Sequence, residues 1–307
     1  MASVKHYTPR PPSSAYLPPS LQRQEIARKQ AQGLLLRRVS SIITYSILGL
    51  MALVVLAPFT WLFLSSLKDT NQFFAVPMVW FPQPAHWVNY AIALNDYHFG
   101  QKVFNSIWLA VVSALAESAS SALVAYGFAR FHFPGRTALF LVVLATMMIP
   151  TQLLSIALFT VYRNLGWIDT FLPLLVPKFF GSAFIIFIYR QFFLKLPREI
   201  DEAGRLDGLN ALGIFWHMIL PQSKPIIIVA SIFSFLNSWR DAWGPLIYLS
   251  SDEKRTIPVG LLFFTTPYGP NYPLIMAATV IALAVPVVLY VLGQRYIDRG
   301  VAIADVR

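Results

Sequence analysis

The sequence predicts an all-α membrane protein with six transmembrane helices, and three observations carry that prediction. Of the 307 residues, 56% are hydrophobic and only 12% are charged, and the mean hydropathy is +0.58, so the chain has too little polar surface to cover a soluble globule. Six apolar runs are each long enough to cross roughly 30 Å of hydrocarbon. The basic residues gather between these runs and at the two ends, so the net charge of +10 indicates membrane topology rather than nucleic-acid binding.

The first 38 residues are expected to form a cytoplasmic tail. They are rich in Pro, Gln, Arg and Lys, and the pairs Pro11-Pro12 and Pro18-Pro19 bracket a segment too polar to pack. A short basic helix is expected from about Leu21 to Arg38, and the tail's basic residues are expected to hold it to anionic lipid. The first apolar run begins too late for a secretory signal, so we expect no processing. Residues 39–307 are predicted to form one transmembrane domain.

The loops between the spans set the orientation. The spans are expected near residues 40–67, 103–129, 137–162, 170–194, 225–250 and 273–294. Fifteen Lys and Arg residues lie in the segments 1–38, 130–136, 195–223 and 295–307, against five in 68–102, 163–169 and 251–272. The positive-inside rule therefore places both termini in the cytoplasm. The outward loop 68–102 holds Trp80, Trp87, Tyr90 and Tyr97, and we expect it to be an ordered segment at the membrane interface.

A polar stretch between the fourth and fifth spans, residues 197–225, carries clear local signals. Pro197 suits a first helical position, acidic residues follow where the helix macrodipole favours anions, and Gly208 can end the helix in a left-handed turn. Asn210 can then cap a second helix, which Pro221 and Pro225 are expected to break. We therefore predict a helix-turn-helix outside the bilayer. One apolar face of its second helix is expected to carry Leu212, Phe215, Trp216 and Ile219.

Charged residues inside the apolar spans are candidates for a functional site, because a charge at the bilayer centre costs at least about 2.5–3.5 kcal/mol on insertion scales. Glu117 either lines a permeation path or proton relay, or is a hydrogen-bonded glutamate buried against a neighbouring helix. Lys178 either faces the same path or snorkels towards the outer surface or a partner. Arg240 and Asp241, late in the fifth span, either contact a polar substrate or form a structural ion pair.

Several kinds of chemistry find no support in the sequence. The chain has no Walker A sequence, no HExxH motif and no nucleophile elbow in a convincing context, so it is expected not to be an enzyme and to have no ATPase site of its own. It has no cysteine, and its five histidines share no metal-ligand spacing, so no metal site is expected. Two alternatives stay open on the residues alone: a secondary transporter with Glu117 as its proton site, and a six-span scaffold or intramembrane enzyme.

The stretch EAGRLDGLNALGIFWHMILPQSKP, which begins at Glu202, resembles the EAA motif of permease subunits of ATP-binding-cassette importers. Further phrases in the right order extend the resemblance over most of residues 40–300. They narrow it to the carbohydrate group, the second-permease type of maltose-like systems. These phrases are Asn105-Ser106, AYGFARFHFPGR (125–136), MIPTQ (148–152), NLGWIDT (164–170), RQFFLKLP, the SW-D--GPLI pattern (238–247), TIPVGL (256–261) and QRYIDRG.

The resemblance implies a type I importer permease fold in a bacterial or archaeal inner membrane, with the loop 197–225 forming coupling helices. It implies four kinds of partner: a homologous second permease, a dimeric ABC ATPase, an extracytoplasmic solute-binding protein and membrane lipid. It implies that the chain forms half of a pathway for a sugar. No cofactor is expected in this chain, since ATP and Mg²⁺ would be used by the ATPase.

The resemblance also assigns the coupling residues. Glu202 and Ala203 stand at the start of the motif, and Asp207 and Gly208 supply its turn. Gly204 stands where a second alanine is usual and is expected to loosen the first helix by about 1 kcal/mol. By spacing alone, Glu202 would instead belong to a solvated helix face with i,i+3 and i,i+4 pairs among Arg198, Asp201, Glu202 and Arg205. Arg240 stands where asparagine is usual, so no sugar-binding residue is transferred.

Overall fold

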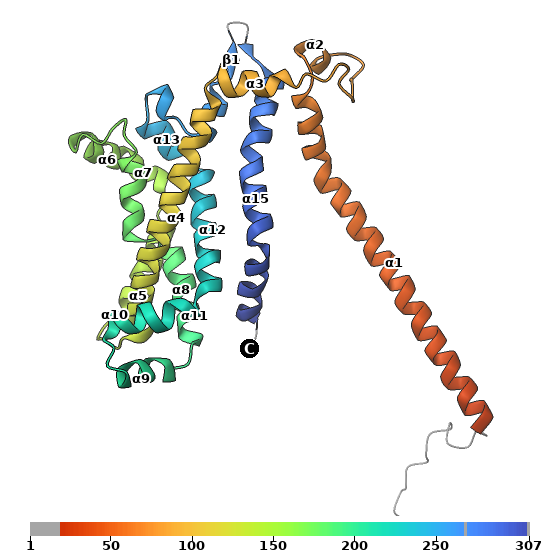
Figure 1. Cartoon of the computed structure of the whole chain (residues 1–307), viewed down its shortest axis with the longest axis vertical. Helices are drawn as coiled ribbons and strands as arrows, with labels where there is room; N and C mark the ends of the chain where they lie inside the picture. The colour runs from red at the N-terminus through yellow and green to blue at the C-terminus, as the bar shows by residue number, and fades with distance from the viewer. Residues whose placement is uncertain (1–18, 267–268, 306–307) are drawn as a thin grey trace, which may run out of the picture. The chain divides into compact units, whose positions relative to one another are not determined.

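The computed structural model describes residues 19–266 and 269–305, and this part of the chain is mostly helical (Figure 1). The Pro-rich part of the predicted tail, residues 1–18, lies outside the described residues. The chain divides into two compact units, Met1–Trp61 and Leu62–Arg307. We describe each unit by itself.

The first unit is dominated by a single helix, α1 (Pro19–Ser66), whose last residues enter the second unit. The helix runs without a break through residue 38, where the sequence suggested that a tail gives way to a membrane domain. From Arg37 to Ser66 it is long and apolar enough to cross a membrane. Between residues 39 and 59 its large apolar side chains are exposed, which is typical of a helix surrounded by lipid or by other transmembrane helices.

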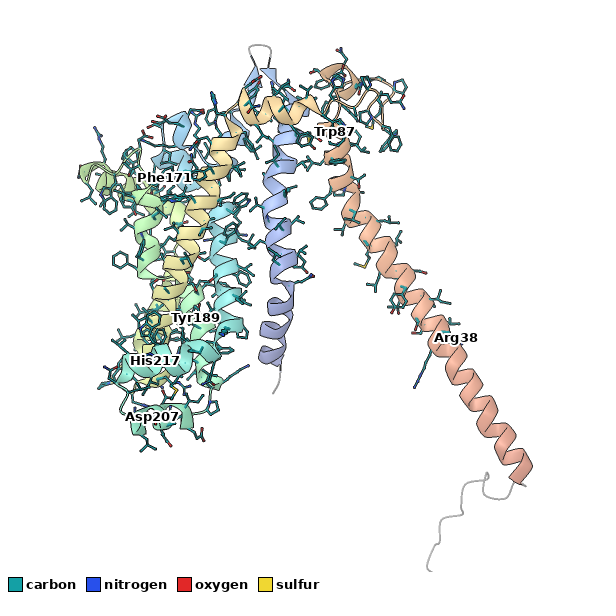
Figure 2. The ribbon with its side chains drawn as sticks, in the orientation of Figure 1. Arg38, Trp87, Phe171, Tyr189, Asp207 and His217 are labelled. Atoms are coloured by element: carbon teal, nitrogen blue, oxygen red, sulfur yellow. The ribbon has the colours of Figure 1, made fainter. Side chains whose placement is uncertain are left out.

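The predicted outward loop is ordered around a buried asparagine. It contains the short helices α2 (Thr70–Phe73) and α3 (Val88–Asn95). The side-chain amide of Asn89 donates hydrogen bonds to the carbonyls of Ser66 and Lys68, both at 2.8 Å. Trp87, the N-cap residue of α3, is largely exposed (Figure 2).

Three helices form the centre of the second unit: α4 (Phe99–Arg130), α8 (Ala183–Lys195) and α12 (Lys224–Trp239). They lie side by side in Figure 1, and hydrogen bonds join them at the small polar residues of α4. Ser118 on α4 lies 2.5 Å from the Tyr189 hydroxyl on α8, and Ser231 on α12 donates to Ser118 at 3.3 Å. Small residues such as these allow transmembrane helices to approach closely.

The third predicted span is bent. The arm formed by α5 (Arg136–Ala145) and η2 (Thr146–Met148) meets α6 (Thr151–Asn164) at 93°. Ile149 has extended backbone because the residue before Pro150 is disfavoured in the helical region. The span predicted near 137–162 is therefore present, but it is broken at Pro150.

The fifth span is shorter than predicted. Its helix α12 is 16 residues long, meets the preceding helical segment at 85°, and ends at Trp239 instead of continuing to residue 250. Among the described residues, four helices are long and apolar enough to span a membrane, and up to six spans result if each bent pair counts as one. The count of six is therefore consistent with the structure, although the bend beside α12 lies at Ser223, before the predicted span 225–250 begins.

The remaining elements complete the second unit. The fourth span, Leu172–Lys195, begins with α7 (Leu172–Leu175) and η3 (Val176–Phe180) before α8. The last span, Tyr272–Gln294, is the first part of the helix α15 (Tyr272–Asp305). Between them lie α13 (Trp243–Tyr248), η5 (Asp252–Lys254), α14 (Ile257–Leu262) and an antiparallel pair of short strands, β1 (Thr265–Thr266) and β2 (Gly269–Pro270).

Candidate functional site

The stretch 197–225 lies at one end of the second unit and forms two short helices, as predicted (Figure 1). The first is α9 (Glu199–Leu206), with three acidic residues in its first turn. Gly208 follows with a φ of +77°, and the N–H groups of Gly208 and Leu209 donate to the carbonyls of Arg205 and Gly204 at 3.0 and 2.9 Å. This is a Schellman turn, in which a glycine adopts the left-handed conformation and satisfies the last carbonyls of the helix. Asp207 caps the helix beside it.

Gly204 has a packing role that the sequence did not show. It is buried on the inner face of α9, and a Cβ added there would lie 2.8 Å from Cγ1 of Ile214. Ile214 is itself 3% exposed, so it has little room to move. The expectation that glycine merely loosens the helix is therefore incomplete, because the missing side chain lets the two helices of the loop pack together. Its neighbours Ala203 and Glu202 are exposed.

The second helical segment begins as predicted but ends differently. The Asn210 side chain accepts a hydrogen bond from the Gly213 N–H at 2.8 Å and caps α10 (Ala211–Ile214). The chain then widens into one π-helical turn, η4 (Phe215–Ile219), and continues through Pro221 in α11 (Leu220–Gln222). A π turn offers i→i+5 bonds in place of the i→i+4 bond that proline cannot donate. The predicted break at Pro221 is therefore wrong, and the bend comes at Ser223.

The predicted apolar face of this segment is divided. Phe215 and Ile219 are buried in the core, whereas Leu212 and Trp216 are more than half exposed. Leu206, at the end of α9, is 89% exposed. Three apolar side chains are therefore exposed on the same helix pair as the carboxylate of Glu202. Leu206 could not be singled out from the sequence, because a single leucine on a short charged helix has no distinguishing pattern.

A buried ion pair fastens α9 to the membrane helix α4. The guanidinium of Arg130, the last residue of α4, lies 3.1 Å from the Asp201 carboxylate and also donates to the Leu196 carbonyl at 3.1 Å. The Tyr126 hydroxyl donates to the Ala211 carbonyl at 3.1 Å. The predicted pairing within α9 is therefore replaced, for Asp201, by a long-range partner. A cation at the C-terminus of α4 also suits the helix macrodipole.

A second polar centre lies between α4, η3 and α12. Glu117 is 5% exposed, its carboxylate lies 3.6 Å from the Lys178 ammonium, and it accepts a short hydrogen bond from Ser234. Two residues singled out separately in the sequence are thus brought together as a pair. In a low-dielectric interior such a pair is far less costly than either charge alone. The paired arrangement satisfies Glu117 without a proton relay.

Lys178 also lines a cavity of about 570 Å³ on the opposite end of the unit from α9. Arg240 and Asp241 line the same cavity, which lies beside α13. The Asp241 carboxylate accepts hydrogen bonds from the N–H groups of Trp243 and Gly244 at 3.0 and 3.2 Å, so it holds the start of α13. Within the described ranges, no ion pair joins Arg240 to Asp241, and the structural ion pair considered for them is absent.

Two ion clusters hold the loops near α13, and neither cluster was predicted from the sequence. The Asp169 carboxylate accepts hydrogen bonds from Ser251 and Ser250 and lies 3.1 Å from the Lys254 ammonium. Hydrogen bonds from Ser251, with those from Lys254 and Ser250, hold the pKa of Asp169 far below its ordinary value. Figure 2 shows Phe171, two residues after Asp169, at the end of the second unit that carries α13, and Asp207 at the opposite end, beside α9.

In the second cluster, Lys102 and Arg255 lie 2.9 and 2.7 Å from the carboxylate of Asp252. Burial, the largest single influence on that carboxyl, raises its pKa, but the two cations together outweigh it and the pKa is lowered. Ion pairs therefore hold the loops at this end of the second unit. One of them joins Lys102 to Asp252, which are 150 residues apart in the sequence.

Comparison with known proteins agrees with this architecture. The family described as "Binding-protein-dependent transport system inner membrane component" matches residues 118–303. The arabinooligosaccharides transport system permease protein AraQ of Bacillus subtilis (strain 168) is 31% identical over 84% of this chain and 92% of its own length. The sn-glycerol-3-phosphate transport system permease protein UgpE of Yersinia pestis is 30% identical over 86% of this chain and 96% of its own.

A solved structure shows the same fold. The crystal structure of a bacterial ABC transporter involved in the import of the acidic polysaccharide alginate contains a chain that superposes with a TM-score of 0.74 at 22% identity. The match covers 84% of the present chain and 96% of that one.

Proposed function

The chain belongs to the family of binding-protein-dependent transport system inner membrane components, and from that premise we propose that it forms half of the pathway of a sugar importer driven by a separate ATPase. The observation that carries the proposal is the helix pair of residues 199–222. It exposes the carboxylate of Glu202 and several apolar side chains, and Arg130 and Tyr126 fasten it to the membrane helix α4. A partner that moves this pair would move the helices with it.

The exposed side of the pair is suited to an ATPase cleft. Glu202 would pair with a basic group in that cleft, while Leu206, Leu212 and Trp216 would fill its apolar part. Their exposure in the single chain, from 56% to 89% for the three apolar residues, leaves a surface that a partner can cover. The chain itself would hydrolyse no ATP. ATP and Mg²⁺ would act on the ATPase, with no cofactor in this chain.

The buried side of the pair provides the transmission. Arg130 and Tyr126 of α4 bind both helices of the pair, and Gly204 lets the two helices contact each other directly. A displacement of α9 therefore reaches α4, and α4 carries the Glu117–Lys178 pair near the cavity. We infer that this path links ATP-driven closure to the opening of the solute pathway.

The complete importer would contain this chain, a homologous second permease, an ATPase dimer and an extracytoplasmic solute-binding protein. It would lie in the plasma membrane of a bacterial or archaeal cell, with both termini of this chain in the cytoplasm as the basic loops indicate. The binding protein would deliver a saccharide or a polyol. The paired state of Glu117 argues against the proton-driven alternative, since its carboxylate already has a cationic partner.

The assembly can be tested by gentle purification from the native membrane, with mass spectrometry of what accompanies the chain in fixed ratio. We expect a second permease and an ATPase. Recovery of the chain alone, or only with copies of itself, would refute the proposal.

The docking surface can be tested with single variants in the same preparation. Glu202→Ala should lower the amount of co-purified ATPase by about tenfold, as expected for loss of a charge-assisted hydrogen bond, and Trp216→Ala should also lower it. Glu253→Ala, which removes an exposed carboxylate at the cavity end, is the matched control and should leave the ratio unchanged. Equal ratios in all three variants would contradict the assignment of this surface.

A further inference from the structure

The segment between α2 and α3, residues 74–88, exposes apolar side chains that the proposed function does not use. Val76 is 97% exposed and Phe81 is 70% exposed. The other large apolar side chains that are more than half exposed in this segment are Phe74, Met78, Trp80, Trp87 and Val88. Exposed apolar side chains gathered in one segment indicate contact with a membrane or with another protein.

The absence of charge in this part of the chain favours the membrane. Between Asp69 and Asp96 the sequence contains no Asp, Glu, Lys or Arg. The loop 250–255, whose sequence is SSDEKR, follows α13, and Figure 1 shows α13 and α3 at the same end of the second unit, opposite α9. A docking surface for a soluble protein has a polar rim. Uncharged segments rich in tryptophan suit the headgroup region of a bilayer.

Ring contacts fix the depth of the segment. Phe63, in the last turn of the first span, meets Trp87 edge to face, with 6.2 Å between the ring centroids. Phe73 stacks at 5.5 Å on Tyr272, which is the first residue of the last span. The segment is therefore tied to two points at which spans end. Its irregular backbone keeps it out of the hydrocarbon core, where unpaired peptide groups are too costly.

The structure also separates the aromatic residues that suggested an interfacial loop. Both tryptophans of the predicted outward loop are exposed, whereas both of its tyrosines are held by contacts within the unit. The Tyr90 hydroxyl shares a 2.6 Å hydrogen bond with the Ser66 hydroxyl. Tyr97 stacks on Phe264 with ring centroids 4.6 Å apart. The aromatic surface available to lipid is therefore confined to residues 74–88.

We propose that residues 74–88 form an anchor in the headgroup region of the leaflet opposite α9, with phospholipid as the partner. Trp80 and Trp87 suit this depth because an indole ring combines an apolar body with a polar N–H group. The charged loop 250–255 then remains in water, where a soluble partner can reach it. This placement does not depend on which solute the chain carries.

The test is a depth measurement by spin labelling, on the full chain reconstituted in nanodiscs of phosphatidylethanolamine and phosphatidylglycerol. The sequence contains no cysteine, so each single substitution creates one labelling site. The test sites are Val76→Cys and Phe81→Cys. Leu53→Cys, in the first span, is the hydrocarbon reference, and Glu253→Cys is the matched control at an exposed position of the charged loop. Collisions of each nitroxide with oxygen, which concentrates in lipid, are compared with collisions with a water-soluble nickel chelate.

We expect the oxygen-to-nickel collision ratio at positions 76 and 81 to be several times that at position 253 and below that at position 53. A ratio equal to that at position 253 would place the segment in water and overturn the inference. A ratio equal to that at position 53 would place it in hydrocarbon and overturn the headgroup assignment. Low collision rates with both reagents would show that protein covers the segment, so lipid would not be the partner. The proposed transport function would survive each of these results, because it depends on other residues.

Discussion

The contact between Gly204 and Ile214 gives the sharpest test of how the proposed coupling loop, residues 197–225, is built. The substitution is Gly204→Ala, which adds one methyl group and would ordinarily stabilise a helix by about 1 kcal/mol. Here the added Cβ would lie 2.8 Å from Ile214 Cγ1, well inside van der Waals contact. Cγ1 is attached directly to the branched Cβ of a buried side chain, so it cannot swing away as the end of a flexible chain could.

The expected magnitude is the difference between these two effects. Overpacking by one methyl group in a tight core costs typically about 1–3 kcal/mol. After the helix-propensity gain of about 1 kcal/mol is subtracted, Gly204→Ala should destabilise the packed loop by up to about 2 kcal/mol. That corresponds to a shift of up to roughly 30-fold in the local opening equilibrium.

The assay is amide hydrogen exchange of α9 in the purified chain, because exchange reports local opening of a single element. Gly204→Ala should speed exchange of the α9 amides. In an Ile214→Ala background, which removes Cγ1, the same substitution should slow exchange, because only the propensity gain remains. Ile214→Ala alone should speed exchange, since emptying a buried isoleucine site costs about 2–5 kcal/mol.

The reversal of sign is what the contact requires. If Gly204→Ala slows exchange in the wild-type background, or acts equally in both backgrounds, the packing argument is refuted. Gly127→Ala provides the control, because Gly127 lies inside the helix α4 with no neighbouring atom within 4 Å of an added Cβ. It should slow exchange in its own helix and leave α9 unchanged.

Three further predictions concern the loop and the opposite end. Gly208→Ala should strain the left-handed turn by about 1 kcal/mol or more and lower solute-stimulated ATPase activity. The control is Gly135→Ala, at a similar φ of +76°, which should lower thermal stability without lowering the stimulated ATPase activity. Equal ATPase stimulation in both variants would contradict the role of the turn. Arg130→Met should destabilise the loop by about 3 kcal/mol because it leaves the Asp201 carboxylate unpaired, and Arg130→Met combined with Asp201→Leu should cost less than the sum of the two single changes; strict additivity in thermal unfolding would mean that the pair is not coupled. The folded-state pKa of Asp169 lies below its ordinary value of 3.8, so the stability that this carboxylate contributes is present above pH 3.8 and is lost as the pH falls further. Thermal unfolding of Asp169→Asn should therefore be less sensitive to acid than that of the wild type. An unchanged pH profile would rule out this contribution.

Much of the coupling loop was predictable from adjacent residues. The turn at Gly208 and the cap at Asn210 depend on backbone conformations and on hydrogen bonds that span only a few positions. Four of the six spans are single segments long and apolar enough to cross a membrane, and length and hydropathy are enough to locate them. Proline was a weaker guide, since Pro58 and Pro286 lie inside helices while Pro150 marks a sharp bend. Whether neighbours can accommodate the missing N–H is decided outside the local sequence.

The class of protein, the positions of the apolar spans, and the caps and turn of the loop 197–225 could be read from the sequence, because these follow from composition and short-range chemistry. The tertiary structure alone decided the partners: Glu117 with Lys178, Arg130 with Asp201, and the close approach of Ile214 to Gly204. These contacts join residues that are far apart in the chain or on different helices. Their geometry depends on how the helices pack, and no local pattern encodes that packing.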